Sequence, residues 1–222
     1  MPSVQPLRIA HRGMPLQALE NTLASFQRAL DEGADGLELD VHATADGEIV
    51  LHHDAILATG LAIATSTLDE LRRHEVGPGV PIPTLGELCA LVSGRATLFV
   101  ELKGAGIERQ VLRALGEYGG GVALHSFDHA MIRRVARIDP SRRLGILFED
   151  APVLVAQVMD QTGALDVWPH RALVTADLVA WVHDAGGRVI PWTVNDEREA
   201  RALAALGVDA LCGDDVRRLV VE

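Results

Sequence analysis

Acidic and histidine side chains interrupt two apolar stretches near the beginning of this chain. Glu38 and Asp40 lie in the run GLELDV at 36–41, and His53 follows a second apolar stretch after Asp46-Gly47. Side chains alternate along a strand, so both carboxylates share one face. Asp-Gly is a strong turn signal, and a hairpin folded symmetrically about it places Asp40 opposite His53. The pattern predicts a hard-cation site beside a proton-transfer group, which suits metal-assisted phosphoester chemistry.

A further apolar run, LFVELK at 98–103, carries Glu101 and Lys103 on one face of its predicted strand. Glu101 can complete a cage of three carboxylates for Mg²⁺ or Ca²⁺, and Lys103 can meet a phosphate. Buried carboxylates repel each other and lose hydration unless a cation compensates. We therefore expect one divalent cation among Glu38, Asp40 and Glu101. Two alternatives stay open: a solvated edge strand for the first run, and an internal ion pair between Glu101 and Lys103.

The triplet His11-Arg12-Gly13 ends the first apolar run of the chain. The planar guanidinium of Arg12 suits phosphate oxygens. His11 and His53 together can form an acid–base pair, because imidazole titrates near neutral pH. His52 has the opposite strand parity and is assigned to the other face. Of the remaining histidines, only His125, on a predicted strand, is a candidate for substrate contact.

Short apolar runs alternate with helix-like segments along the whole chain. We predict eight strands, at 7–11, 36–42, 97–103, 122–127, 144–148, 166–169, 188–194 and 210–213. Helices are expected to begin at 21–22 and at 84, to cover 107–118, 128–138, 153–162, 175–185 and 197–206, and to end with a short one from 214. This alternation predicts a (β/α)8 TIM barrel, with an open doubly wound sheet as the alternative. Polar residues at many strand ends favour the barrel: His11, Asp40, Lys103, Ser126, His170 and Asn195.

The segment between the second and third predicted strands is too long for a simple connection. A β-hairpin over 44–54 is expected to stand above the second strand. Residues 55–83 then form a short irregular cap, with one helical turn at 68–73. We take 1–222 as a single catalytic domain that contains this cap as an insertion.

Composition excludes several classes of protein. The net charge of −11 argues against nucleic acid or an anionic bilayer as partner, so we expect no stable membrane association. The start of the chain lacks a basic, apolar leader, and Cys89 and Cys212 are isolated. These features favour a cytoplasmic protein with two reduced thiols over one with a disulfide. The sequence has no zinc spacing, phosphate-binding loop or serine elbow, and it leaves the oligomeric state open.

The chain resembles the glycerophosphodiester phosphodiesterase family over nearly its whole length. The resemblance is carried first by the segments His11-Arg12-Gly13, Glu20-Asn21-Thr22, Gly33-Ala34-Asp35-Gly36, Glu38-Leu39-Asp40-Val41, Thr44-Ala45-Asp46-Gly47 and His53-Asp54. Later motifs are Pro83-Thr84-Leu85, Val100-Glu101-Leu102-Lys103, Ser126-Phe127, Trp192-Thr193-Val194-Asn195 and Gly207-Val208-Asp209-Ala210.

The resemblance implies a (β/α)8 barrel that hydrolyses small-molecule glycerophosphodiesters to sn-glycerol 3-phosphate and an alcohol. It also implies roles for eight residues: Glu38, Asp40 and Glu101 hold one Mg²⁺ or Ca²⁺, His11 and His53 are the acid and base, Arg12 and Lys103 bind the phosphate, and Trp192 packs on the glycerol or alcohol. The alternative for Trp192 is a core residue that closes the barrel.

The chain departs from the family pattern in its cap. The stretch LATGL at 57–61 lacks the arginine that the family commonly has there, and the cap is short and without aromatic residues. Both departures concern the leaving alcohol. A lysophospholipase D-like activity on a lipid-bearing diester and a non-catalytic phosphoester-binding barrel are the alternatives. The presence of both histidines argues against mere binding, which requires no acid–base pair.

Overall fold

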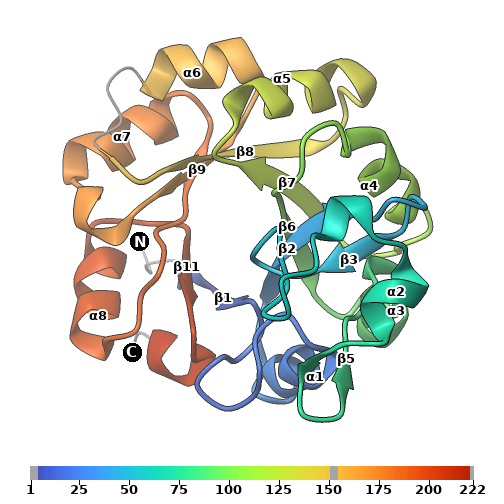
Figure 1. The fold of residues 1–222 in the computed structure, drawn as a ribbon. Helices are drawn as coiled ribbons and strands as arrows, with labels where there is room; N and C mark the ends of the chain where they lie inside the picture. The colour runs from blue at the N-terminus through green and yellow to red at the C-terminus, as the bar shows by residue number, and fades with distance from the viewer. Residues whose placement is uncertain (1–4, 151–154, 221–222) are drawn as a thin grey trace.

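Eight parallel strands follow one another around a barrel in the computed structural model, which describes residues 5–150 and 155–220 (Figure 1). Their order is β10-β9-β8-β7-β6-β2-β1-β11. The bounds are β1 (Leu7–His11), β2 (Gly36–Ala43), β6 (Thr97–Leu102), β7 (Val122–Ser126), β8 (Arg143–Phe148), β9 (Asp166–Pro169), β10 (Arg188–Val189) and β11 (Ala210–Gly213). The predicted TIM barrel is confirmed, because the chain forms one ring of strands with helices outside it.

The barrel closes between β10 and β11 through irregular hydrogen bonds. The predicted strand at 188–194 is regular only over its first two residues, since Pro191 has no N–H to donate. Closure instead uses three backbone bonds: Asp209 N to Val189 O at 3.0 Å, Cys212 N to Pro191 O at 3.1 Å, and Val194 N to Cys212 O at 2.8 Å. These bonds bring the last strand beside the segment that carries Trp192.

Within the described residues, seven helices surround the barrel: α1 (Leu23–Asp31), α3 (Leu85–Val92), α4 (Glu108–Ala114), α5 (His129–Ile138), α6 (Val155–Thr162), α7 (Ala176–Asp184) and α8 (Glu197–Ala205). Side-chain caps fix where most of them begin. Thr22 and Thr84 accept hydrogen bonds from the first turns of α1 and α3, as expected. Positions 153–154 of one predicted helix lie outside the described residues. The predicted last helix is a 3₁₀ turn, η3 (Val216–Leu219).

Large side chains fill the barrel interior and close one of its ends. Trp168 is buried in the barrel and packs edge to face on Phe99, with ring centroids 5.4 Å apart. At the amino-terminal end of the strands, the buried Asp166 carboxylate pairs with Arg143 at 2.6 Å and with Arg188 at 2.8 Å. These ion pairs occupy the amino-terminal end of the barrel, opposite the strand ends that carry His11, Asp40 and Lys103.

The hairpin after β2 differs from the prediction by one residue. Strand β3 (Ile49–Leu51) pairs with β2 so that Val41 faces Leu51 and Ala43 faces Ile49. The loop is therefore centred on Asp46 itself and not between Asp46 and Gly47. The backbone N–H of His52, and not of His53, donates to Asp40 O at 3.1 Å. The predicted pairing of Asp40 with His53 is wrong.

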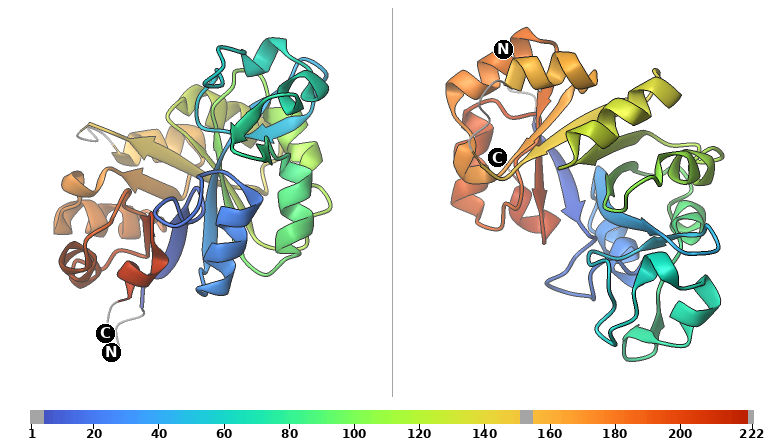
Figure 2. Two further views of the ribbon diagram at one scale, coloured as in Figure 1. Left: turned by 60° about the horizontal axis from the view of Figure 1, so that its bottom comes forward. Right: turned by 45° about the horizontal axis from the view of Figure 1, so that its top comes forward.

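The cap contains more regular structure than the sequence predicted. The helical turn is present as α2 (Leu68–Arg72), after the 3₁₀ turn η1 (Ile63–Thr65). An unpredicted hairpin of β4 (Glu75–Gly77) and β5 (Val80–Pro81) follows. Four buried apolar residues of the cap form a small core together with Val50 of β3; they are Leu57, Ile63, Leu71 and Ile82. Figure 2 shows this insertion to one side of the barrel, where Arg72 of α2 pairs with Glu87 of α3.

No helix among residues 5–150 and 155–220 is both long and apolar enough to cross a membrane.

Candidate active site

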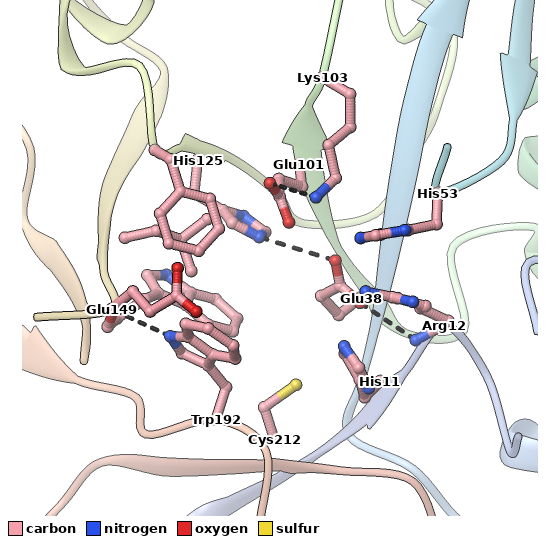
Figure 3. A pocket seen from close by; sticks show the side chains of 13 residues that line it. His11, Arg12, Glu38, His53, Glu101, Lys103, His125, Glu149, Trp192 and Cys212 are labelled. Atoms are coloured by element: carbon pink, nitrogen blue, oxygen red, sulfur yellow. Dashed lines mark hydrogen bonds and ion pairs between the residues drawn. The ribbon is translucent and has the colours of Figure 1, made fainter. Parts of the chain in front are cut away.

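A cavity of about 210 Å³ opens at the carboxyl-terminal end of the strands (Figure 3). Seven of the eight predicted site residues line it: His11, Arg12, Glu38, His53, Glu101, Lys103 and Trp192. The eighth, Asp40, is fully buried behind Arg12 and Lys103. The structure therefore brings together residues from β1, β2 and β6 or directly after them, from the loop after β3, and from the segment after β10.

Register between neighbouring strands places the carboxylates side by side. Asp40 of β2 is paired with Glu101 of β6, and Glu38 of β2 is paired with His11 of β1. Strand β2 lies between β1 and β6 and is buried along almost its whole length, so the solvated edge strand is ruled out. The exposed fractions of Glu38, Asp40 and Glu101 are 3%, 0% and 7%.

Two basic side chains contact this carboxylate cluster. Lys103 Nζ lies 2.8 Å from Glu101 Oε1 and 3.3 Å from Asp40 Oδ1, so the ion pair considered for Glu101 and Lys103 is present. Arg12 Nε lies 3.0 Å from Asp40 Oδ2, and the Arg12 backbone N–H donates to Glu38 Oε2 at 3.0 Å. Three carboxylates thus face two positive charges.

The excess of negative charge affects the pKa values of the carboxylates. Burial and the neighbouring Asp40 charge raise the pKa of Glu101 to about 8. Burial also acts to raise the pKa of Asp40, but the Lys103 and Arg12 charges outweigh it and lower that pKa. The positive charge of Lys103 therefore compensates Glu101 only in part.

The donor set fits a divalent cation. Asp40 Oδ1 is buried and accepts no hydrogen bond from the described residues. Glu38, Glu101 and His125 offer ligand atoms that all lie within 4.8 Å of one another. Carboxylate oxygens suit hard cations, and a cation would offset the remaining negative charge. His125, which the sequence suggested only for substrate contact, thus lies within reach of the same ion.

The ring of His11 is held by a carboxylate from the other end of the chain. Its Nδ1 donates to Asp214 Oδ1 at 2.7 Å. Asn195 in turn donates to Asp214 Oδ2 at 2.5 Å and accepts from the Asp214 backbone N–H at 2.9 Å. Burial acts to lower the pKa of His11, but the hydrogen bond to Asp214 and the Glu38 charge outweigh it, so that pKa is raised.

His53 reaches the cavity by a different route from the one predicted. Strand β3 ends at Leu51, so the alternation of the ladder no longer governs the two residues that follow. His53 faces the cavity from the loop (Figure 3), and its backbone carbonyl accepts from His42 Nε2 at 3.1 Å. Its own Nδ1 donates to Asp54 Oδ1 at 2.8 Å.

Aromatic side chains form the opposite wall of the cavity. Trp192 donates from Nε1 to Trp168 O at 3.1 Å and packs edge to face on Phe127, with centroids 5.6 Å apart. Trp192 therefore both packs on the barrel core and lines the cavity. Cys212 lines the floor, where burial raises the pKa of its thiol well above the usual range. Both Cys212 and Cys89 are free, as expected.

Sequence reasoning assigned no role to Asp214 and Asp54 as the partners of His11 and His53, or to Asn195 as the partner of Asp214. The sequence did contain a signal for Asp214. This residue directly follows the last predicted strand, just as His11 ends the first one. Those strands pair in the barrel, with Ala10 beside Gly213. Asp214 and His11 come into contact only because the barrel closes and places the first and last strands side by side.

Comparisons with known proteins agree along the chain. Residues 11–218 match the model of the glycerophosphoryl diester phosphodiesterase family. A protein of Caldanaerobacter subterraneus subsp. tengcongensis named glycerophosphodiester phosphodiesterase is 31% identical over 236 residues, which cover 98% of this chain and 97% of the relative.

Solved structures give the same result. A putative glycerophosphoryl diester phosphodiesterase from Silicibacter pomeroyi is 29% identical, with a TM-score of 0.89 over 99% of this chain and 92% of its own. An Oleispira antarctica phosphodiesterase, solved in complex with the product sn-glycerol-3-phosphate, is 27% identical, with a TM-score of 0.89 over 97% of this chain and 95% of its own.

Proposed function

Since this chain belongs to the glycerophosphoryl diester phosphodiesterase family and is an enzyme of glycerophosphodiester hydrolysis, we propose that it releases sn-glycerol 3-phosphate and an alcohol by acid–base catalysis with His11 and His53. One observation carries the proposal. Two imidazoles, each held at Nδ1 by a carboxylate, line the same cavity as an acidic cluster that fits a cation. The Oleispira relative, bound to sn-glycerol-3-phosphate, supports this product.

Glu38, Asp40 and Glu101 are the proposed oxygen ligands of one divalent cation, Mg²⁺ or Ca²⁺. When bound, such a cation stabilises negative charge on the phosphoryl oxygens. The raised pKa of Glu101 and the buried Asp40 Oδ1, which accepts no hydrogen bond from the described residues, support this assignment, because Lys103 and Arg12 do not fully compensate the three carboxylates.

Arg12 and Lys103 are the proposed phosphate-binding residues. Both line the cavity, and their side chains are only 18% exposed, so their charges act in a poorly solvated setting. The Arg12 guanidinium matches two phosphate oxygens, whereas Lys103 supplies a single concentrated charge. Both remain anchored to Asp40, which fixes their positions before substrate arrives.

The two imidazoles are proposed to move the protons of the reaction. A hydrogen bond at Nδ1 leaves Nε2 of each ring for substrate. One ring takes a proton from the attacking oxygen, which belongs either to water or to the glycerol 2-hydroxyl, and the other protonates the departing alkoxide. If the 2-hydroxyl attacks first, water then opens the cyclic phosphate to give sn-glycerol 3-phosphate. Trp192, with Phe127, offers an aromatic wall for the carbon skeleton of the substrate.

Turnover of glycerophosphocholine, scored by release of sn-glycerol 3-phosphate, tests the proposal. We expect activity that EDTA abolishes and a divalent cation restores. Lysophosphatidylcholine in a parallel assay tests the lysophospholipase D-like alternative, which requires hydrolysis of the lipid-bearing diester. Binding of glycerophosphocholine without turnover under any divalent cation would contradict the proposed function and favour the non-catalytic barrel.

Several expectations remain predictions. Three concern the cellular setting: the cytoplasmic location, the lack of stable membrane association and the lack of nucleic-acid partners. The fourth is the assignment of residues 1–222 to one catalytic domain. Fractionation of cells that express the protein measures the first two.

A further inference from the structure

We propose that His125 Nε2 is a nitrogen ligand of the cation, and that the site therefore takes Mn²⁺, Co²⁺ or Zn²⁺ in preference to Ca²⁺. The inference rests on the proposed function, because it concerns the same cation. It differs in the chemistry of the donor set, which changes from carboxylate oxygens alone to carboxylate oxygens with one imidazole nitrogen.

Strand register brings His125 to the acidic cluster. His125 of β7 is paired with Glu101 of β6, and its Nε2 lies 3.8 Å from Glu38 Oε1 (Figure 3). That separation is too long for a hydrogen bond. Ligand atoms lie about 2.0–2.6 Å from a bound ion, so two of them are at most roughly 4–5 Å apart. The ligand atoms of Glu38, Glu101 and His125 all lie within 4.8 Å of one another, which meets this condition.

The imidazole of His125 is oriented by packing. It stacks on Trp168, with centroids 4.3 Å apart and an angle of 11° between the rings. Phe99 packs on Trp168 in turn, and His125 is 1% exposed. The ring therefore has little freedom to turn its Nε2 away from the carboxylates, which is the preorganisation that a metal ligand requires.

His125 also lacks a hydrogen-bonding role within the protein. Its Nδ1 is buried and has no partner among the described residues. No hydrogen bond from the described residues therefore fixes the ring, and its orientation depends on the stacking against Trp168. Histidines held by the protein's own network behave differently here: His129 donates to Leu147 O at 3.0 Å, and His183 to Asp209 Oδ2 at 2.9 Å.

Neither basic side chain of the cluster forms an ion pair with Glu38. Arg12 and Lys103 both contact Asp40, and Lys103 also contacts Glu101. Among residues 5–150 and 155–220, Glu38 meets only the backbone N–H of Arg12 and the imidazole of His125, which is 3.8 Å away. Imidazole nitrogen favours metals of intermediate softness, whereas Ca²⁺ takes oxygen ligands, so this donor set shifts the preference of the site.

Electron spin-echo spectroscopy of bound Mn²⁺ tests the proposal without any measurement of activity. The full chain is stripped with EDTA and loaded with one equivalent of Mn²⁺. We expect a ¹⁴N coupling that changes to a ¹⁵N coupling when the protein is labelled with ¹⁵N-histidine. The coupling should vanish in His125→Gln and persist in His11→Asn, His53→Asn and the surface control His183→Gln. Absence of a histidine coupling in the wild-type protein overturns the proposal, even if His125→Gln fails to fold.

Metal preference gives a second readout. The ratio of the Kd for Ca²⁺ to the Kd for Mn²⁺ should fall by about tenfold or more in His125→Gln and stay constant in His183→Gln. An unchanged ratio in folded His125→Gln, as judged by its Tm, refutes the role. The proposed function fails separately, if the wild-type enzyme with any divalent cation releases no sn-glycerol 3-phosphate.

Discussion

The two cavity histidines have the same kind of partner in different surroundings. His11 is bound to Asp214, with side chains 17% and 20% exposed, and Asn195 fixes that carboxylate. His53 is bound to its neighbour Asp54, with side chains 37% and 72% exposed. Water screens the second pair and allows its side chains to move, so the first pair orients its ring more strictly.

This difference shows how a fold strengthens an interaction that local sequence can only suggest. The His11 pair joins residues 203 positions apart, and the closing strands of the barrel hold both ends. The His53 pair joins residues adjacent in the sequence, on a loop that follows a short strand. Strength here follows from burial and from a third group, not from the distance alone, which is nearly equal in the two pairs.

Removal of either imidazole is the largest expected effect. His11→Ala and His53→Ala should each lower kcat for glycerophosphocholine by about 10²–10⁴-fold, the usual range for positioned acid–base catalysis. A p-nitrophenyl diester has a leaving group that requires less protonation, so the variant that lacks the acid should lose much less on that substrate. The two substrates, assayed in parallel, identify the acid. Near wild-type turnover by both variants would refute the mechanism.

Loss of Lys103 should weaken both substrate binding and the chemical step. Lys103→Ala is expected to raise KM and to lower kcat/KM by about 10²–10³-fold, because charge on the phosphoryl oxygens changes in the transition state. Steady-state kinetics measures the effect. Arg72→Ala is the matched control, since Arg72 pairs with Glu87 outside the cavity. Equal kinetics in the two variants would exclude Lys103 from phosphate binding.

Neutralisation of the two carboxylate partners tests the comparison directly. Asp214→Asn should lower kcat roughly 10- to 100-fold, because the His11 ring loses its orientation and tautomer. Asp54→Asn should lower kcat less than about fivefold, as expected for an exposed pair. Kinetics of both variants, with melting curves to verify folding, decide the matter. Comparable losses of kcat would mean that burial does not make the His11–Asp214 pair more important than the His53–Asp54 pair.

The smallest expected effect is a shift of the pH profile. The hydrogen bond to Asp214 and the Glu38 charge hold the pKa of His11 above its usual value, against the effect of burial. Asp214→Asn removes one raising contribution, so the His11 limb of the kcat/KM profile should move to lower pH. Asp54→Asn should leave that limb in place. A shift of the limb to higher pH in Asp214→Asn would contradict the electrostatic account.

Local patterns predicted much of the fold and several neighbours in the site. Alternation placed Glu38 and Asp40 on one face of their strand, and Glu101 and Lys103 on one face of theirs. The structure shows all four side chains together. The hairpin register failed by one residue, because the position of the loop centre depends on the backbone of the turn. His53 reaches the cavity only because the ladder stops before it.

The sequence by itself determined the alternation of barrel strands and outer helices and which side chains β2 and β6 turn toward the cavity. Those properties depend on side-chain alternation and on capping residues a few positions away. Only the tertiary structure decided that His11 meets Asp214 and that His125 faces Glu38. Such contacts depend on strand register and barrel closure, which arise from packing over the whole molecule and leave no periodic trace in the chain.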